Sequence, residues 1–393
     1  MFVKSIFLEY NAAKVQKKLY ICKKNSIFAA DKQDMVIKKT LLVALIGLFL
    51  SSCGKQGGDS ISYDVDSARV VIEEAIADTI IPGAVLCVVE DGEIVYTEAY
   101  GNRAVYPEVE AMTENTIFDL ASVSKPTGAG SAALLLIAEG RLSADDKVCE
   151  YLPGYHSDVD VRHLMTHYSG LPAYMGVKGL QWIVDSLQLT DQALRDFMID
   201  TIGRCQRPSG VGEKYRYSCL NFISLQRVVE AIVDMDINRY MRTGLYKELG
   251  LREMGWLPAD RLHGRIAPTE CIDGECLRGE VHDPLARVMM RGVSGNAGVF
   301  ATAEDVATWA IWFMNLSPEV RAQGCNAGLW TDSVETSTGA LIQSCRHTGY
   351  TGTSVAILPT EKRAVVLLTN RVHPKDEHNL GALRRVINAL LVP

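Results

Sequence analysis

The sequence lacks several features that would place it in a common class. Its 393 residues hold no Lys/Arg block longer than a pair and carry a formal net charge of -7, so the basic stripe of a nucleic-acid-binding surface is missing. No G-x-S-x-G segment is present, which excludes the nucleophile elbow of α/β-hydrolases. We therefore expect no nucleic-acid partner.

Zinc spacings are missing as well. His163 and His167 stand four residues apart, but Leu164 occupies the position where H-E-x-x-H needs glutamate. The acidic loop that contains Asp273 and Asp283 favours a solvated surface over a metal cage. Neither a metal nor a cofactor is predicted, and the oligomeric state stays open.

The apolar run from Thr40 to Leu50 is too short to cross a bilayer as a helix, which needs about 20 residues. It follows Lys38 and Lys39 and ends in Leu-Ser-Ser-Cys, an arrangement typical of a signal peptide. These last four residues resemble the lipobox of bacterial lipoproteins, and the resemblance implies acylation of Cys53. We expect an exported protein, lipid-anchored in the periplasm or at the outer membrane.

This interpretation divides the chain into three parts. Residues 1–53 form a leader with a lipoprotein signal peptide, and translation starts at Met1 or Met35. The Gly/Ser-rich residues 54–63 form a flexible tether. Residues 64–393 form the folded domain, and a hydrophobic share of 48% is ample for its core.

Ten cysteines in an exported protein raise the question of disulfides. Cys22 and Cys53 fall in the leader, which leaves eight in the domain. Two pairs are close in sequence, Cys271 with Cys276 and Cys205 with Cys219. Free buried thiols are an equally good alternative.

Turn and cap signals outline the elements. A helix capped by Asp64 or Asp66 should run to Ile80, and Asp91-Gly92 should join two strands in a hairpin. The expected strands are Ala84–Glu90, Glu93–Tyr100, Arg346–Tyr350, Thr353–Leu358 and Ala364–Thr369, and a final helix covers Asn379–Leu391.

The middle of the chain, from Val161 to Glu253, has a mostly helical pattern. Strands at both ends around a helical middle predict an α/β fold of the α+β type. Its mixed or antiparallel sheet, flanked by helices, is built from about 64–120 and 290–393. An all-helical insertion covers about 121–289.

The segment Ser122–Glu139 combines a helical pattern with a reactive residue pair. Its middle is apolar on every face, which predicts a buried helix. In S-x-x-K on a helix, Ser122 and Lys125 share a face, so the lysine can activate the serine hydroxyl. Burial and the helix N-terminus should both lower the pKa of Lys125 toward that of a usable base.

The motif alone has low specificity. Ser52 and Lys55 match it by chance in the lipobox segment, and a structural N-cap serine would look like Ser122.

Two further motifs follow in order, Tyr217-Ser218-Cys219 and His347-Thr348-Gly349. With Ser122-Val123-Ser124-Lys125 they resemble the serine β-lactamase and penicillin-binding family. The chain is most similar to the branch of class C β-lactamases, D-Ala-D-Ala carboxypeptidases and related esterases. Supporting stretches are 117–121, 163–172, 295–302 and 351–353, and the resemblance extends from about Ser67 to Pro374.

The resemblance implies a β-lactamase/transpeptidase-like fold and a role for each motif residue. Ser122 is the acylated nucleophile, Lys125 its proton acceptor and Tyr217 a base or relay for the attacking water. The backbone N–H groups of Ser122 and Tyr350 form the oxyanion hole. Thr348, Gly349, Tyr350 and Cys219 contact the substrate, and Gly349 keeps the strand edge clear for it.

Two positions depart from the β-lactamase pattern. His347 replaces a lysine and would hold a substrate carboxylate less firmly, although it stays among the catalytic candidates. Cys219 replaces an asparagine that grips the substrate amide, and a thiol donates and accepts poorly. Efficient penicillin hydrolysis is therefore not expected.

The predicted activity is hydrolysis through an acyl-enzyme. The substrate would be an ester, a D-amino-acid peptide or a β-lactam-like amide in the cell envelope. The partners would be a small-molecule or peptidoglycan-derived substrate and, through Cys53, the membrane. The alternative is a catalytically weak, penicillin-binding-like sensor or scaffold.

Overall fold

The computed structural model describes residues 64–177, 186, 189–335, 339 and 341–391. The chain divides into two compact units, Met1–Ser62 and Tyr63–Pro393, and the second unit contains every described residue. The predicted leader, tether and Cys53 lie outside the described residues. No helix in the described part is both long and apolar enough to span a membrane.

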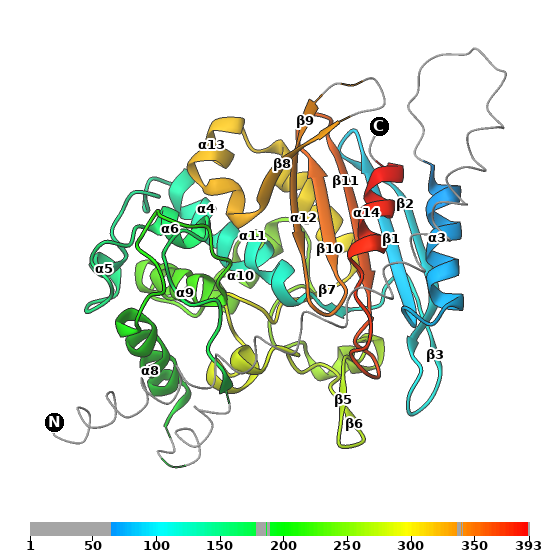
Figure 1. Ribbon diagram of the computed structural model, residues 1–393, viewed down its shortest axis with the longest axis horizontal. Coiled ribbons are helices and arrows are strands. Elements are labelled where there is room, and N and C mark those ends of the chain that lie inside the picture. Colours follow the sequence, from blue (N-terminus) through cyan, green and yellow to red (C-terminus); the bar gives the residue numbers. More distant parts are fainter. Residues whose placement is uncertain (1–63, 178–185, 187–188, 336–338, 340, 392–393) are drawn as a thin grey trace. The chain divides into compact units, whose positions relative to one another are not determined.

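A seven-stranded sheet forms the centre of the domain, in the order β3-β2-β1-β11-β10-β9-β8 (Figure 1). Every neighbouring pair is antiparallel. The strands are β1 Gly83–Glu90, β2 Glu93–Ala104, β3 Glu110–Ala111, β8 Trp330–Glu335, β9 Leu341–Thr348, β10 Ser354–Leu358 and β11 Arg363–Thr369. The predicted α/β fold class is confirmed, and the sheet is antiparallel. The insertion at about 121–289 is not all-helical as predicted, because Cys271–Ile272 and Glu275–Cys276 form a short hairpin within it.

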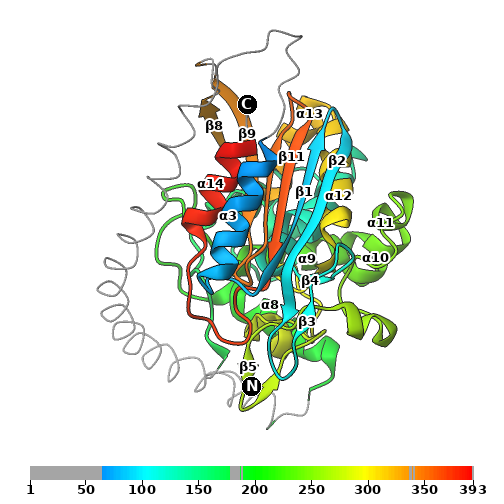
Figure 2. The same cartoon turned by 90° about the vertical axis from the view of Figure 1, so that its right-hand side faces the viewer.

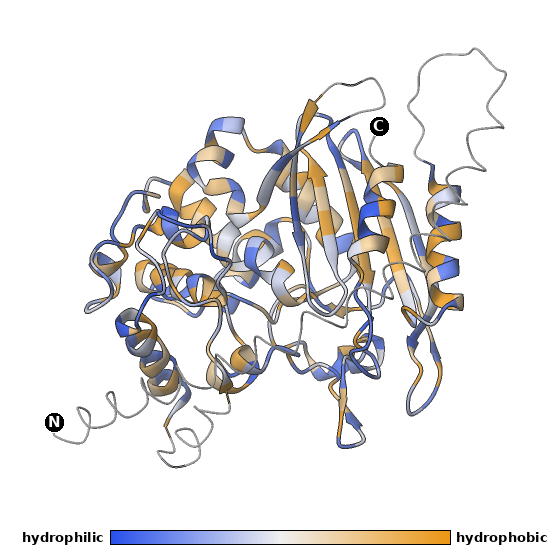
Figure 3. Ribbon diagram, viewed as in Figure 1, coloured by the Kyte–Doolittle hydropathy of each residue, from blue (hydrophilic) through white to orange (hydrophobic). Residues whose placement is uncertain are grey.

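Helices cover both faces of this sheet. On one face α3 (Val65–Ala77) packs against α14 (Gly381–Leu391), and on the other lies α12 (Ala303–Asn315), as Figure 2 shows. Side chains of β1 alternate between the two layers, so Leu86 joins the α3/α14 core while Val85 joins the main core. Coverage on both sides explains why the central strands are apolar along their length (Figure 3).

Along the sequence, the helical region lies between the strands β1–β3 and the strands β8–β11. Its α-helices are α4 Ser131–Ala138, α5 Val148–Tyr151, α6 Val161–Met165, α8 Asp191–Arg204, α9 Cys219–Val233, α10 Ile237–Thr243 and α11 Leu245–Glu248. The apolar stripe of α9 faces the main core, where Phe222, Leu225 and Val229 are fully buried. This helix agrees with the mostly helical pattern predicted for Val161 to Glu253.

Shorter elements complete the domain: η1 Ala121–Val123, η2 Lys125–Gly130, η4 Asp260–Arg265, η5 Leu285–Met289, η6 Cys325–Gly328 and α13 Pro318–Gln323. Two small two-stranded sheets pair β4 (Phe118–Asp119) with β7 (Phe300–Ala301) and β5 (Cys271–Ile272) with β6 (Glu275–Cys276).

Several element boundaries differ from the prediction. The first helix is capped by Asp64 and ends at Ala77 rather than Ile80, since Thr79 takes a φ of 57°. Strand β9 begins earlier than expected and stops at Thr348, so Tyr350 lies on a turn. The hairpin prediction is confirmed, with Asp91 and Gly92 at φ values of 52° and 80°.

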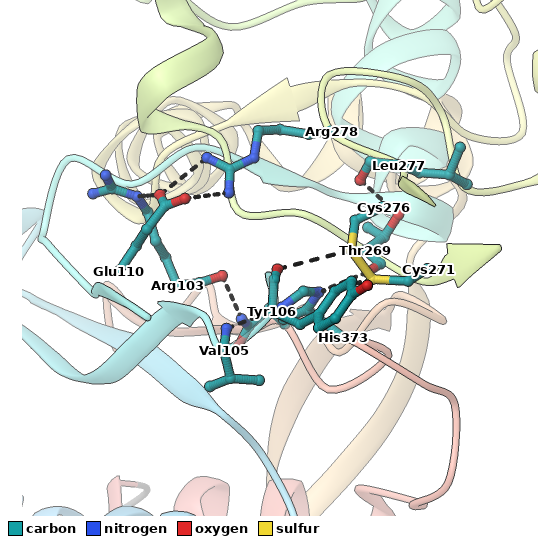
Figure 4. Close-up of a disulfide and its surroundings, with 11 residues drawn as sticks. Arg103, Val105, Tyr106, Glu110, Thr269, Cys271, Cys276, Leu277, Arg278 and His373 are labelled. Atoms are coloured by element: carbon teal, nitrogen blue, oxygen red, sulfur yellow. Dashed lines mark hydrogen bonds and ion pairs between the residues drawn. A yellow bond between two sulfur atoms is a disulfide. The ribbon is translucent and has the colours of Figure 1, made fainter. Parts of the chain in front are cut away.

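One of the two possible disulfides is present. Cys271 and Cys276 are joined across the β5–β6 hairpin (Figure 4). Cys205 and Cys219 are both free thiols, so at these two positions the alternative of unpaired thiols is the one observed. The hairpin is also tied to the C-terminal region, because the Cys271 N–H donates to Pro374 O over 2.8 Å.

Candidate active site

Ser122 lies on an irregular helical segment and not on the single α-helix predicted for Ser122–Glu139. The 310-helix η1 is followed by the π-helix η2 and only then by α4. Pro126 has no N–H to donate, and the Ser131 hydroxyl donates to Pro126 O over 2.7 Å. Single-turn π-helices often occur at functional sites.

Lys125 reaches Ser122 despite this irregularity. Its Nζ lies 3.0 Å from Ser122 Oγ and 2.8 Å from Asn296 O. The lysine is fully buried. The predicted contact between the two motif residues is therefore present.

Tyr217 lies beside this pair. Lys125 Nζ is 5.0 Å from the centre of the Tyr217 ring, which packs 4.5 Å from the ring of His167. The tyrosine precedes α9, whose N-cap Ser218 accepts from the Leu220 N–H. This cap fixes the start of the helix next to the second motif.

The pKa of Lys125 differs from expectation. Burial alone lowers the pKa of Lys125, but the neighbouring Cys219, Tyr217 and Asp283 side chains together raise it by more, so the pKa of Lys125 lies above its ordinary value. Burial also raises the pKa of Tyr217, and the opposing attraction of Lys125 is too weak to reverse this. The predicted lowering of the lysine pKa was wrong, and both groups hold their protons at neutral pH.

His347 lies at the end of β9 and is fully buried. Its ring stacks on Trp330, with 4.5 Å between centroids and 12° between planes. Burial first, and then the neighbouring Lys125 and His167 side chains, hold the pKa of His347 well below its usual range. A neutral imidazole follows, with Nδ1 placed 3.0 Å from Thr348 O and therefore protonated.

The turn after β9 is tied to the nucleophile segment. The hydroxyls of Thr351 and Thr353 donate to Asp119 O and Leu120 O over 2.7 and 2.8 Å. A Cβ on Gly349 would lie 2.1 Å from Thr353 Oγ1 and 2.4 Å from Leu120 O. Glycine is needed here for the close approach of two backbones, a reason different from the predicted clearance for substrate.

A cleft opens at Ser122. Its lining residues are Ser122, Tyr217, Trp330, Thr348, Gly349, Tyr350, Arg371, Asp376, Glu377, His378, Asn379, Leu380 and Arg384. The structure thus brings predicted residues from all three motifs to one surface, together with a C-terminal segment that was not predicted. Cys219 is a partly exposed free thiol outside this lining.

Sequence reasoning missed several groups around the site. Asn296, whose carbonyl accepts from Lys125, belongs to the G-N-A-G stretch and could have been found there. Asp283 is only partly exposed, in contrast to the predicted solvated loop, and accepts from Asn296 Nδ2 over 3.3 Å. No sequence signal marked Trp330 or Arg384.

Within the described residues, one group of side chains has metal-ligand spacing: Cys271, Cys276 and His373. The two sulfur atoms form the disulfide there. His373 uses both ring nitrogens, since Nε2 accepts from the Val105 N–H and Nδ1 lies 3.0 Å from Thr269 O (Figure 4). This arrangement leaves no ligand lone pair on the histidine.

The family model named Beta-lactamase matches residues 68–389. The chain belongs to the β-lactamase family. This places the site described above in a family of serine hydrolases and agrees with the resemblance of its three motifs.

Two curated relatives cover most of the sequence. An N-acetylmuramyl-L-alanine amidase of Bacillus subtilis (strain 168) is 30% identical over 350 residues, which cover 74% of this chain and 78% of the relative. A protein of Escherichia coli (strain K12) named as a D-alanyl-D-alanine carboxypeptidase is 28% identical, covering 74% and 79%.

Solved structures share the fold. EstCE1, a hydrolase with promiscuous acyltransferase activity, aligns with a TM-score of 0.64 at 21% identity and covers 83% of this chain and 98% of its own. A class C β-lactamase also aligns with a TM-score of 0.64, at 19% identity, covering 86% and 98%. At these identities the likeness shows the fold alone.

Proposed function

We propose that the protein is a serine hydrolase that acts through an acyl-enzyme on Ser122. The observation that supports this most directly is the 3.0 Å contact of Ser122 Oγ with Lys125 Nζ at the floor of an open cleft. A serine hydroxyl needs a neighbouring base to attack a carbonyl carbon. Lys125 and Tyr217 are the groups within reach.

In the first half-reaction Ser122 Oγ bonds to the substrate carbonyl carbon, and its proton passes to the deprotonated form of the Lys125–Tyr217 pair. The negative charge develops on the carbonyl oxygen, where the N–H groups of Ser122 and Tyr350 would stabilise it. The carbon–leaving-group bond then breaks and the leaving group takes the proton. A water molecule, deprotonated by the same pair, releases the acyl group.

The substrate would be an ester, a D-amino-acid peptide or a β-lactam-like amide. The relatives' names, an amidase and a carboxypeptidase, favour a peptidoglycan-derived compound. A neutral His347 and a thiol at Cys219 argue against efficient β-lactam hydrolysis, since neither replaces the ammonium and amide usual there.

Labelling and turnover test this proposal together. A fluorophosphonate should modify the wild type and an exposed-serine control, Ser333→Ala, but not Ser122→Ala. Lys125→Met should keep the fold and lose turnover of an activated ester. Equal labelling or equal rates in the wild type and Ser122→Ala would contradict the mechanism.

The second candidate is a penicillin-binding-like sensor or scaffold, and the free thiol of Cys219 in place of an amide favours it. Such a protein would stay unlabelled in the wild-type form and would bind a peptidoglycan fragment without releasing a product. The same labelling experiment therefore separates the two functions.

Export and lipid anchoring through Cys53 belong to the proposal as well. If Cys53 is acylated, the wild type should incorporate a labelled fatty acid in bacteria and Cys53→Ser should not. Equal incorporation in both proteins would rule out this anchor.

A further inference from the structure

The peptide group between Gly349 and Tyr350 has a contact that the motifs did not predict. Its N–H, from Tyr350, is the second donor of the proposed oxyanion hole. Its carbonyl oxygen, on Gly349, accepts a hydrogen bond from Arg384 Nη2 over 2.7 Å. Because the oxygen and the N–H belong to one conjugated group, a cation at the oxygen makes the N–H a stronger donor.

Arg384 also holds the turn that follows. The same Nη2 donates to Thr353 O over 3.0 Å, while the Gly349 N–H donates to Thr353 O over 2.7 Å. One guanidinium thus joins both ends of the turn that carries Tyr350. The contact fixes the direction of the Tyr350 N–H as well as its polarity.

The charge of Arg384 is unusual for its surroundings. None of the ion pairs in the described part of the chain includes it, and its Nε is buried without a hydrogen-bond partner. Burial and the charge of Arg371 lower the pKa of Arg384 to about 10, so it stays cationic at neutral pH. A partly buried cation without a carboxylate partner lowers the stability of the folded protein. Because no counter-charge reduces its electric field, the cation interacts strongly with a carbonyl oxygen next to it.

Arg371 provides the contrast. Its Nε donates to Tyr350 O over 2.8 Å, on the next peptide group, but its Nη1 pairs with Asp376 over 2.6 Å. The carboxylate cancels much of that charge. Arg384 has no such carboxylate partner among the described residues, so its full positive charge polarises the Gly349–Tyr350 peptide.

We propose that Arg384 is a positioning residue that orients and polarises the Gly349–Tyr350 peptide for stabilising the oxyanion. The proposal rests on the acyl-enzyme function proposed above. Through Arg384, helix α14 would contribute to catalysis at Ser122 although it lies on the outer face of the sheet.

Steady-state kinetics on Arg384→Gln and Arg384→Lys would test this role, with the exposed neighbour variant Arg385→Gln as the matched control. For an activated ester we expect Arg384→Gln to lower kcat/KM about 10-fold, less than the roughly 100-fold loss for removing an oxyanion donor itself. The loss should lie in kcat, with KM unchanged. Arg384→Lys should retain part of the rate, and Arg385→Gln should match the wild type.

A boronic acid that forms a tetrahedral adduct with Ser122 reports on the same interaction at equilibrium. Its affinity should fall in Arg384→Gln by the same factor as kcat/KM, whereas a purely structural role would change KM and thermal stability instead. An unchanged kcat and boronate affinity in a folded Arg384→Gln protein would overturn the proposal.

The amide NMR signal of Tyr350 keeps the two proposals distinguishable. Loss of the cation should move its proton resonance upfield in Arg384→Gln, whether or not the enzyme turns over. If the wild type fails to be acylated, the proposed function is wrong. If the Tyr350 signal does not move, the role of Arg384 is wrong.

Discussion

The titratable side chains of the site differ in protonation state at neutral pH, as Lys125, Tyr217 and His347 show. His347 is neutral because burial and two nearby cationic or imidazole side chains disfavour its charged form. Lys125 and Tyr217 both have raised pKa values, so both are protonated at neutral pH. Since the nucleophile needs a base, only the small deprotonated fraction of this pair is reactive.

The pH–rate profile should reflect this fraction. Deprotonation of a group with a raised pKa increases as pH rises, so kcat/KM for a neutral ester should climb through the neutral range and level off only in alkaline solution. Tyr217→Phe removes one of the two coupled groups, Lys125 and Tyr217. It should lower the rate and also shift the pH range over which kcat/KM rises.

Stopped assays of the wild type, Tyr217→Phe and Ser333→Ala across a pH series would measure this, with an uncharged substrate to exclude its own titration. If kcat/KM instead rises with a midpoint near the ordinary histidine pKa of about 6.5, the base is an imidazole and this account is contradicted.

At the scale of elements, the π-helix η2 depends on close packing. A Cβ on Gly130 would lie 2.0 Å from Ala327 O, and one on Gly128 would lie 2.7 Å from the Trp256 ring. Small residues at these positions let η2 approach η6 and the helical core. This packing sets where Lys125 Nζ lies relative to Ser122.

Gly130→Ala should therefore lower the free energy of unfolding by about 1–3 kcal/mol, the usual cost of overpacking a core. It should also reduce ester turnover, because the backbone of η2 must move. Gly264→Ala is the control, since nothing lies within 4 Å of its added Cβ. Urea unfolding of both variants gives the comparison, and equal stabilities would show that η2 is not constrained by this contact.

Local signals predicted part of this structure. Asp91-Gly92 defined its hairpin because positive φ is a property of the two residues themselves. The contact of Ser122 with Lys125 followed from a spacing of three. In contrast, the π-helical form of Lys125–Gly130 and the contact of Arg384 with Gly349 arise from packing between segments far apart in sequence, which no local pattern encodes.

At the scale of the described domain, segments from both ends of the chain support the site. Strand β1 pairs with β11, and α3 packs on α14. The nucleophile segment lies between the helical region and the turn after β9, tied to that turn by Thr351 and Thr353. Stability of the whole domain is thus coupled to the groups buried around Ser122.

Two of those groups are histidines, and they predict how the domain responds to acid. Burial and then Lys125 lower the pKa of His167 to about 3, and burial holds the pKa of His347 well below its usual value. In the unfolded chain both titrate near about 6.5. Between these values the unfolded state binds more protons, so stability must fall as pH falls below about 6.5.

The free energy of unfolding, measured in urea at a series of pH values, should drop by up to about 1.4 kcal/mol per pH unit for each buried histidine over this range. His167→Phe removes one titrating group and should flatten the slope, even if the variant is less stable at neutral pH. His263→Gln, at an exposed position, should leave the slope unchanged. A slope in His167→Phe equal to that of the wild type would mean that His167 is protonated at no cost in the folded protein, against its burial beside Tyr217 and Lys125.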